Sequence, residues 1–275
     1  MSQPSSLSVT YTTTVTPDQI DELGHMNVRW YGHSARAATT ALAERLGVAE
    51  PSIVSAYTRH HHEQLVGAEL EVRSGVVDRG PRLWLYHELR NRSDDDLAAT
   101  FVHEIDHRRI EARSIELPDY GRPRTLDLDV DRFATFPALD ELRSRGLAAR
   151  LERPVTEQDA HPNDLFWGGE RPGGESSWIH ETAEGDRVAS ATMESRIWMP
   201  HYPAVGTRIQ SFVANLHVGD KISHELGWVF DVDAGTPVAV YEGVDLAFSI
   251  NQRKSVVKPP EVKERELQFL HADLA

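Results

Sequence analysis

The sequence repeats itself at a fixed offset, and this repeat constrains the fold more than any other feature. The segment VGAELEVRSGV at 66–76 can be laid over VGTRIQSFVAN at 205–215, which pairs Gly67 with Gly206. Further along, Gly80 pairs with Gly219 at the same offset of 139 residues. A recurring segment of this length indicates a structural unit that occurs more than once. We therefore predict two copies of one domain-sized unit.

Each copy continues with the alternation of apolar and polar residues that is typical of half-buried strands. In the first copy Leu70, Val72 and Val76 share one face, with charged residues between them. In the second copy apolar residues recur at even positions, so we expect that edge of the strand to face a core: Val238, Val240, Val244, Leu246, Phe248 and Ile250. Turn residues at 78–81, 93–96, 219–220 and 233–237 separate the runs. Long antiparallel strands joined by short turns follow.

One helix is expected before this meander in the first copy, from Val28 to about Leu46, with Gly47 as its stop. One face of this helix is apolar and rich in alanine, so we expect it to be buried closely against the sheet: Tyr31, Ala35, Ala38, Leu42 and Leu46. Each unit therefore combines a strand, a helix and about four antiparallel strands, which is an α+β fold. We expect a first unit over 1–118, a linker over 119–146 with a short helix from Ala138 to Arg145, and a second unit over 147–275.

Composition limits the classes of function. The chain has 275 residues, enough for two cores, and no cysteine, which excludes a disulfide framework, a thiolate metal site and a thiol nucleophile, so we look for catalytic groups among its His, Asp, Glu and Ser side chains. The formal net charge of −14 argues against nucleic acid as a partner. The sequence shows neither a leader segment nor an apolar stretch long enough to span a membrane, so we predict a cytoplasmic protein.

The densest cluster of chemically useful residues lies at 18–27, between a strand and the start of the expected helix. A helix N-terminus offers unpaired N–H groups and a positive dipole end, which can stabilise a developing oxyanion. The candidate amides are those of Met26 and Val28. Asp21 can activate water or attack directly, and His25 can orient it. Helix capping is the competing explanation for Asp21, and it is as strong as catalysis for Asn27.

The run Asp-x-x-Gly-His-Met-Asn at 21–27, followed by aromatic residues up to Tyr31, resembles the signature of hotdog-fold acyl-CoA and acyl-carrier-protein thioesterases. The strand with Gly67, the run LAAT at 97–100 and the run NQRK at 251–254 extend the likeness, in tandem form, over roughly 7–115 and 150–260. It implies two tandem hotdog units, each an antiparallel sheet wrapped around a central helix.

The resemblance also implies chemistry. The residue at the position of Asp21 acts as nucleophile or general base on the thioester, His25 assists, and the helix start polarises the carbonyl. The substrate is an acyl-CoA or an acyl carrier protein, and no cofactor is needed. A homo-oligomer, a dimer of tandem units, is expected by the same likeness and because most oligomers are symmetric. We therefore predict hydrolysis of an acyl thioester, with Asp21, His25 and Asn27 as catalytic residues.

The second copy carries a weaker motif. His161 and Asn163 correspond to His25 and Asn27, and Glu157 then stands where Asp21 does, with Asp159 as an alternative acid. Pro162 lacks an amide N–H and glycines interrupt the helix that follows, so an oxyanion site is less secure here. We expect one working site per chain, in the first copy.

Three further residues are candidates for binding substrate: His62, Trp167 and Arg108, the last of which can meet the phosphates of coenzyme A. The histidines at 60–62 do not share one face of a strand, and the HEIDH run at 103–107 lacks metalloprotease spacing. No metal site is predicted. Two rival functions remain open: a hotdog hydratase or dehydratase, whose usual motif fits 21–27 poorly, and a non-catalytic module that binds acyl-CoA or lipid.

Overall fold

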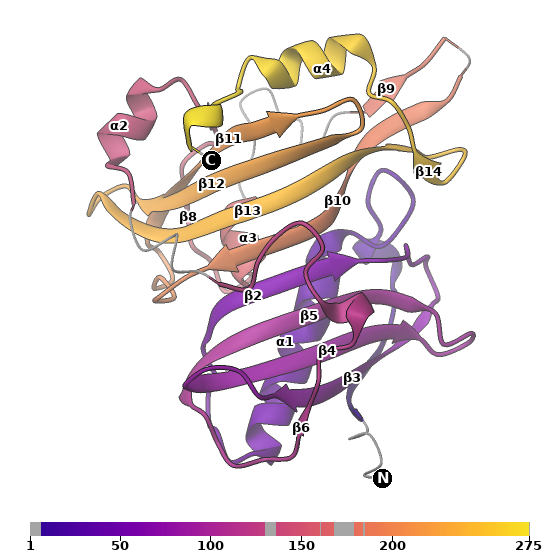
Figure 1. The fold of residues 1–275 in the computed structure, drawn as a ribbon, viewed down its shortest axis with the longest axis vertical. Coiled ribbons are helices and arrows are strands. Elements are labelled where there is room, and N and C mark those ends of the chain that lie inside the picture. Colours follow the sequence, from indigo (N-terminus) through magenta and orange to yellow (C-terminus); the bar gives the residue numbers. More distant parts are fainter. Residues whose placement is uncertain (1–6, 130–135, 160, 168–178, 184, 275) are drawn as a thin grey trace. The chain divides into compact units, whose positions relative to one another are not determined.

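The computed structural model describes residues 7–129, 136–159, 161–167, 179–183 and 185–274. The chain divides into two compact units, Met1–Arg124 with Ala160–Asn163 (unit 1) and Thr125–Asp159 with Asp164–Ala275 (unit 2). Figure 1 shows both as antiparallel sheets accompanied by helices. No helix in the described part combines the length and the apolar composition that a membrane span requires.

Unit 1 is a curved sheet with one long helix. Its strands lie in the order β1-β3-β4-β5-β2, every neighbouring pair antiparallel, and the short β6 joins β3 in parallel. The elements are β1 (Ser8–Thr14), η1 (Pro17–Gln19), α1 (Val28–Arg45), β2 (Ile53–His60), β3 (Glu69–Val77), β4 (Arg82–Asn91), β5 (Leu97–Arg108), β6 (Ser114–Ile115) and η2 (Asp119–Gly121).

Unit 2 repeats this strand order as β7-β11-β12-β13-β10, which confirms the tandem repeat. Gly67 and Gly206, paired by the repeat, both adopt positive φ, 84° and 91°. The remaining elements, including the boundary helix α3, are α2 (Leu139–Ser144), β7 (Ala148–Ala149), β8 (Arg153–Pro154), α3 (Pro162–Trp167), β9 (Ile179–Glu181), β10 (Arg187–Trp198), β11 (Arg208–Val218), β12 (Ile222–Asp231), β13 (Thr236–Ser249), β14 (Lys254–Ser255), α4 (Pro260–Leu267) and η4 (Ala272–Leu274).

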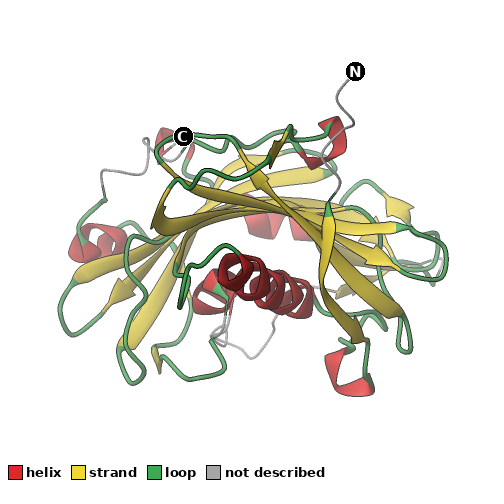
Figure 2. Cartoon of the chain, turned by 90° about the horizontal axis from the view of Figure 1, so that it is seen from below, coloured by secondary structure: helices red, strands yellow, loops and turns green. Residues whose placement is uncertain are grey.

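Helix α1 forms where the sequence predicts it. It begins after Asn27, whose Oδ1 accepts the N–H of Arg29 at 3.0 Å, and the chain turns away at Gly47, where φ is 79°. Four residues of the expected apolar face are buried, Tyr31, Ala35, Ala38 and Leu42, and Leu46 at its end is half-buried. Figure 2 shows this helix lying along the concave side of the strands, and its small alanines let it approach β3, β4 and β5 closely.

The expected alternation on β13 is only partly correct. Val238, Val240 and Val244 are buried as expected, but Leu246 and Phe248 are half-buried while the odd-numbered Ala247 and Ser249 are buried. Both faces of β13 are buried from Val238 to Asp245, so burial over that stretch does not follow the alternation, and the register irregularity between Thr192 and Glu194 lies in the partner strand β10.

Part of the segment predicted as a linker packs against unit 2. Glu194 on β10 accepts the amide N–H groups of Thr125 (3.0 Å) and Leu126 (3.2 Å). Arg196, fully buried on the same strand, donates to the carbonyl of Asp127 and to Glu242 Oε2 (2.7 Å for the latter). Buried charges are tolerated only when paired in this way. Residues 125–129 therefore belong to the packed structure of unit 2.

The inner face of unit 2 contains a close approach that yields a stability prediction. A Cβ added at Gly227 would lie 2.2 Å from the Phe166 ring and 2.9 Å from the Phe212 carbonyl oxygen. We expect Gly227→Ala to lower the free energy of unfolding by about 2–3 kcal/mol, because overpacking forces neighbours to shift. Denaturant unfolding measures the loss. In a Phe166→Ala background, Gly227→Ala should lower the free energy of unfolding by less. An equal loss in both backgrounds would contradict the close packing of Gly227 against Phe166.

Candidate active site

The predicted motif forms a small hairpin that ends at the start of α1. The amide of Asp21 donates to the carbonyl of His25 (2.9 Å), and that of Asn27 donates to Gln19 (2.9 Å). Gly24 closes the turn with φ 85°, a conformation that favours glycine. These main-chain bonds place Asp21 directly opposite His25.

A second segment is attached to this hairpin through the main chain. The buried Met26 donates its amide N–H to the carbonyl of Gln64 at 2.7 Å. Gln64 is buried as well, and its Oε1 accepts from Asn91 at the end of β4, 3.0 Å away. The residues that follow β2 are therefore fixed against the motif, and Glu63 is among them.

The His25 imidazole lies between two carboxylates. Its Nδ1 is 3.5 Å from Asp21 Oδ2, and its Nε2 is 3.1 Å from Glu63 Oε1. The other oxygen of Asp21 accepts the amide of Leu23 at 2.9 Å. The side chains of Asp21 and His25 keep 18% and 13% of their surface exposed, so a small molecule can reach them from solvent. Glu63 is the third member of this group, and the sequence analysis did not select it.

Tyr31 adds a phenol beside the three residues. Its hydroxyl donates to the carbonyl of His62 at 3.3 Å. Burial is the main reason that the pKa of Tyr31 lies above its ordinary value, and the carboxylates of Glu63 and Asp21 raise this pKa further. The phenol therefore remains a hydrogen-bond donor at neutral pH.

The amides expected to form an oxyanion site are only partly available. The Met26 N–H is engaged by Gln64, so the expectation that it stabilises an oxyanion is wrong for this arrangement. Asn27 acts as the helix cap through Oδ1, which is the structural alternative considered for it. Within the described residues, the Val28 N–H, the first of the helix, has no hydrogen-bond acceptor. Val28 remains the candidate donor.

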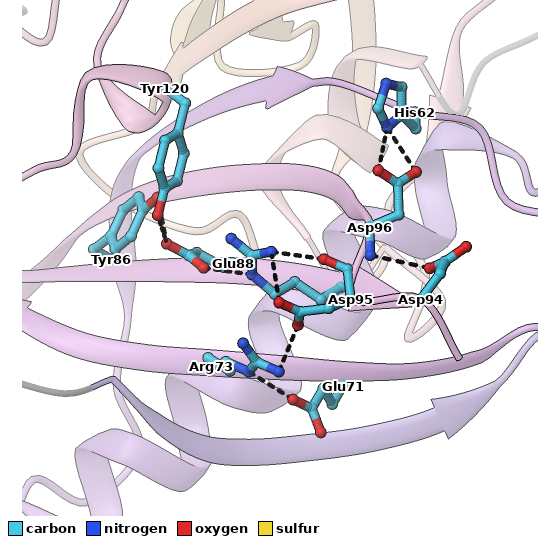
Figure 3. Close-up of polar contacts among 10 residues, drawn as sticks. His62, Glu71, Arg73, Tyr86, Glu88, Asp94, Asp95, Asp96 and Tyr120 are labelled. Atoms are coloured by element: carbon cyan, nitrogen blue, oxygen red, sulfur yellow. Dashed lines mark hydrogen bonds and ion pairs between the residues drawn. The ribbon is translucent and has the colours of Figure 1, made fainter. Parts of the chain in front are cut away.

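Of the three substrate-binding candidates, the structure describes the side chains of two, His62 and Arg108. The exposed His62 bonds Asp96 at 2.6–2.7 Å, and Figure 3 shows its ring turned toward that carboxylate, beside a polar network on β3 and β4. Ala98 on β5 lies near the site, because its carbonyl accepts the amide N–H of His61. Arg108 is exposed at the other end of β5, about 33 Å along the strand from Ala98. Arg108 therefore lies away from this loop, and its contact with the phosphates of coenzyme A stays a prediction. The side chain of Trp167 lies outside the described residues.

The neighbouring histidines have separate partners. His60 packs edge-on against Tyr31, with ring centroids 5.3 Å apart, and His61 Nε2 lies 3.4 Å from the Thr100 hydroxyl. Burial lowers the pKa of each imidazole to about 4, so both are neutral at physiological pH. His107 is exposed and bonds the Arg108 carbonyl, whereas His103 is buried.

The acids of the second copy differ in their surroundings. Asp159 is buried, and its carboxylate receives two bonds from Arg153, at 2.8 and 2.9 Å, and one from the Thr156 amide at 2.7 Å. Burial opposes ionisation here, but these partners outweigh it and lower the pKa of Asp159. Glu157 is exposed. His161 Nδ1 accepts the amide of Asn163 at 3.2 Å, which is a capping contact.

Comparison with known proteins identifies the fold through structure rather than sequence. No protein-family model matches the chain, and no curated protein matches it in sequence. The 12:0-ACP thioesterase from Umbellularia californica superposes with a TM-score of 0.58 at 8% identity, covering 86% of this chain and 93% of that one. An acyl-ACP thioesterase from Bacteroides thetaiotaomicron gives 0.53 at 11% identity, covering 86% and 96%.

A conserved protein of unknown function with a hot dog fold, from Alicyclobacillus acidocaldarius, is similar to the same extent. Its TM-score is 0.54 at 12% identity, and the match covers 87% of this chain and 95% of that one. At such identities the likeness concerns the fold alone. Over most of its length, the chain has the tandem hotdog fold seen in acyl-ACP thioesterases.

Proposed function

We propose that the chain hydrolyses an acyl thioester, an acyl-CoA or an acyl carrier protein, to the free acid and the thiol. The observation that carries this proposal is the His25 imidazole held between Asp21 and Glu63 at a helix start. Hydrolysis of a thioester needs an ionised oxygen or an activated water, and a donor for the oxyanion. Both can be supplied at 21–28 without a cofactor.

The shorter contact of His25 suggests how protons are arranged. A neutral imidazole donates from one nitrogen only, and the Nε2 contact with Glu63, at 3.1 Å, has the better length for a hydrogen bond. Nδ1 then turns its lone pair toward Asp21. Two acceptors side by side favour a water that donates to both, and Asp21 takes the proton as this water attacks. Direct attack by Asp21 is the other route, and both require its carboxylate ionised.

The carbonyl oxygen of the thioester is assigned to the Val28 amide. As the first N–H of an eighteen-residue helix, it combines a hydrogen-bond donor with the positive end of the dipole. The bond from Met26 to Gln64 supports this site indirectly, because it keeps Glu63 beside His25. We assign the second copy a packing role, because the carboxylate of Asp159 is already engaged in an ion pair with Arg153.

The first experiment measures thiol release from a panel of acyl-CoAs. We expect Asp21→Asn to lower kcat by about 10²–10⁴-fold, the range for loss of a general base. Asp18→Asn, the same substitution at an exposed position of η1, is the matched control and should leave the rate unchanged. Free thiol distinguishes hydrolysis from hydration of a double bond. Binding of acyl-CoA without thiol release would favour the non-catalytic module.

Glu63 yields a separate prediction. Glu63→Gln retains the shape of the side chain but removes the charge that faces His25 Nε2, so we expect kcat to fall while KM changes little. The same substitution at the exposed Glu69 is the control. A purely structural role for Glu63 predicts a lower melting temperature with unchanged kcat, and that result would remove Glu63 from the site.

The acids of the second copy are tested by stability together with activity. The lowered pKa of Asp159 means that its carboxylate stabilises the folded state above about pH 4, and that this contribution is lost as the pH falls through the folded pKa. Asp159→Asn should therefore cost about 3 kcal/mol at pH 7 and less in acid. Glu157→Gln should change neither stability nor thiol release. A loss of activity in Glu157→Gln as large as that in Asp21→Asn would contradict a single working site.

A further inference from the structure

Beneath α1 in unit 1 lies a chain of buried hydroxyls and imidazoles that the proposed reaction does not use. Thr39 Oγ1 stands 2.9 Å from His87 Nε2 and 2.8 Å from His103 Nδ1. His87 Nδ1 lies 2.7 Å from the Ser74 hydroxyl. All four side chains are at most 2% exposed. A polar chain inside an apolar core costs stability unless every member is paired.

The Thr10 end of this hydrogen-bonded series determines the donor and the acceptor of every hydrogen bond in the series. Ser74 Oγ lies 2.6 Å from Thr10 Oγ1, and the Thr10 hydroxyl also reaches the carbonyl oxygen of Val72 at 3.2 Å. A carbonyl only accepts, and a hydroxyl has one proton, so Thr10 donates to Val72. Ser74 must then donate to Thr10, and His87 Nδ1–H must donate to Ser74. The opposite direction would lose the bond to Val72.

The same rule continues through Thr39 to His103. With its proton on Nδ1, His87 accepts at Nε2 from the Thr39 hydroxyl, and Thr39 accepts from His103 Nδ1–H. His103 Nε2 is left as a lone pair. Burial lowers the pKa of His103 to about 3, so the ring stays neutral. Among the described residues no donor bonds this nitrogen, although its ring is completely buried. Unpaired buried acceptors are uncommon and costly.

A second unpaired polar group lies on the adjacent strand. Thr58 on β2 is 2% exposed, and its hydroxyl has no partner within the described part of the chain. Ala56 is the register partner of His103, and Thr58 is the partner of Phe101. Thr58 and His103 are thus diagonal neighbours on the face toward α1, with backbones about 7–8 Å apart.

These two groups lie on a path that begins at the proposed site. His60 follows Thr58 by two residues and therefore lies on the same face of β2. Its ring contacts Tyr31, which lies beside Asp21 and Glu63. From Ala99, the partner of His60, to His103 the strand runs about 13 Å. We call His60, Thr58 and His103 the polar stripe. It leads inward from the catalytic loop, where the acyl group of a bound thioester would extend.

We propose that the polar stripe binds the acyl group, and that the preferred acyl group carries a hydroxyl toward its far end, which donates to His103 Nε2 and accepts from the Thr58 hydroxyl. This inference rests on the proposed thioesterase function. An unsubstituted chain would cover both polar atoms without pairing them. A site built to bond a hydroxyl discriminates strongly against an analogue that lacks it. The substrate class is therefore a hydroxylated acyl thioester.

The test separates binding from hydrolysis. Non-hydrolysable thioether analogues of acyl-CoA, from hexanoyl to palmitoyl and each with or without a terminal hydroxyl, are titrated calorimetrically into the wild-type protein. We expect the hydroxylated member of the best-fitting pair to bind at least about tenfold more tightly, equivalent to 1.4 kcal/mol. Thr58→Val should remove this preference and Thr58→Ser should keep it. Thr100→Val, the same change at a buried position on the other face of β5, should also keep it.

A second readout does not depend on affinity. Nitrogen chemical shifts of the histidines should show His87 and His103 protonated at Nδ1, and the Nε2 signal of His103 should move when the hydroxylated analogue binds. Equal affinity for both members of every pair, or a Thr58→Val variant that keeps the preference, would overturn the proposal. An ordered water that remains on His103 Nε2 with the analogue bound would do the same. If the preference holds but no thioester is cleaved, the stripe stands and the thioesterase proposal fails.

Discussion

The arrangement of the candidate site depends on one main-chain hydrogen bond, from the amide of Met26 to the carbonyl of Gln64. It joins the hairpin before α1 to the segment that follows β2, and these are far apart in the sequence. Because Glu63 immediately precedes Gln64, the same bond places a carboxylate against His25 Nε2. Burial of both Met26 and Gln64 protects the bond from water, which makes it a rigid support.

Much of the fold could be predicted because the signals were local. Asn27 and Gly47 mark the limits of α1, the alanines mark its buried face, and Gly67 with Gly206 marks the repeat. The interior of β13 was harder. Residues Val238–Asp245 are buried on both faces of the strand, and alternation in the sequence cannot show which faces the neighbouring elements cover.

The residues of the candidate site also fall into those that the sequence could predict and those that it could not. Asp21 and His25 lie within one motif, so their proximity could be predicted. Glu63 could not be selected, because its only local mark was a run of three histidines that suggested metal binding. The amide of Met26 was misjudged because its acceptor is thirty-eight residues away. The place of Arg108 could not be predicted for a related reason: the sequence gives its strand, but only the register shows which end of the sheet it occupies.

The buried polar residues of unit 1 illustrate how a hotdog core can accommodate more than hydrocarbon. His87 and His103 are neutral because burial disfavours the charged imidazole, and the hydroxyls of Thr39 and Ser74 pair them. In unit 2 the Arg196 and Glu242 pair satisfies buried charge with the segment 125–129. The proposed binding of a hydroxylated acyl group rests on His103 Nε2, which has no hydrogen-bond partner among the described residues.

The central claim is that Asp21, His25 and Glu63 act together on a thioester, and the coupling of two substitutions tests it most directly. Thiol release is measured for Asp21→Asn, for Glu63→Gln and for the double variant with one acyl-CoA substrate. Residues that work as a unit are strongly non-additive, so the account predicts a double variant hardly slower than Asp21→Asn alone. A double variant whose loss equals the product of the two single losses would contradict it.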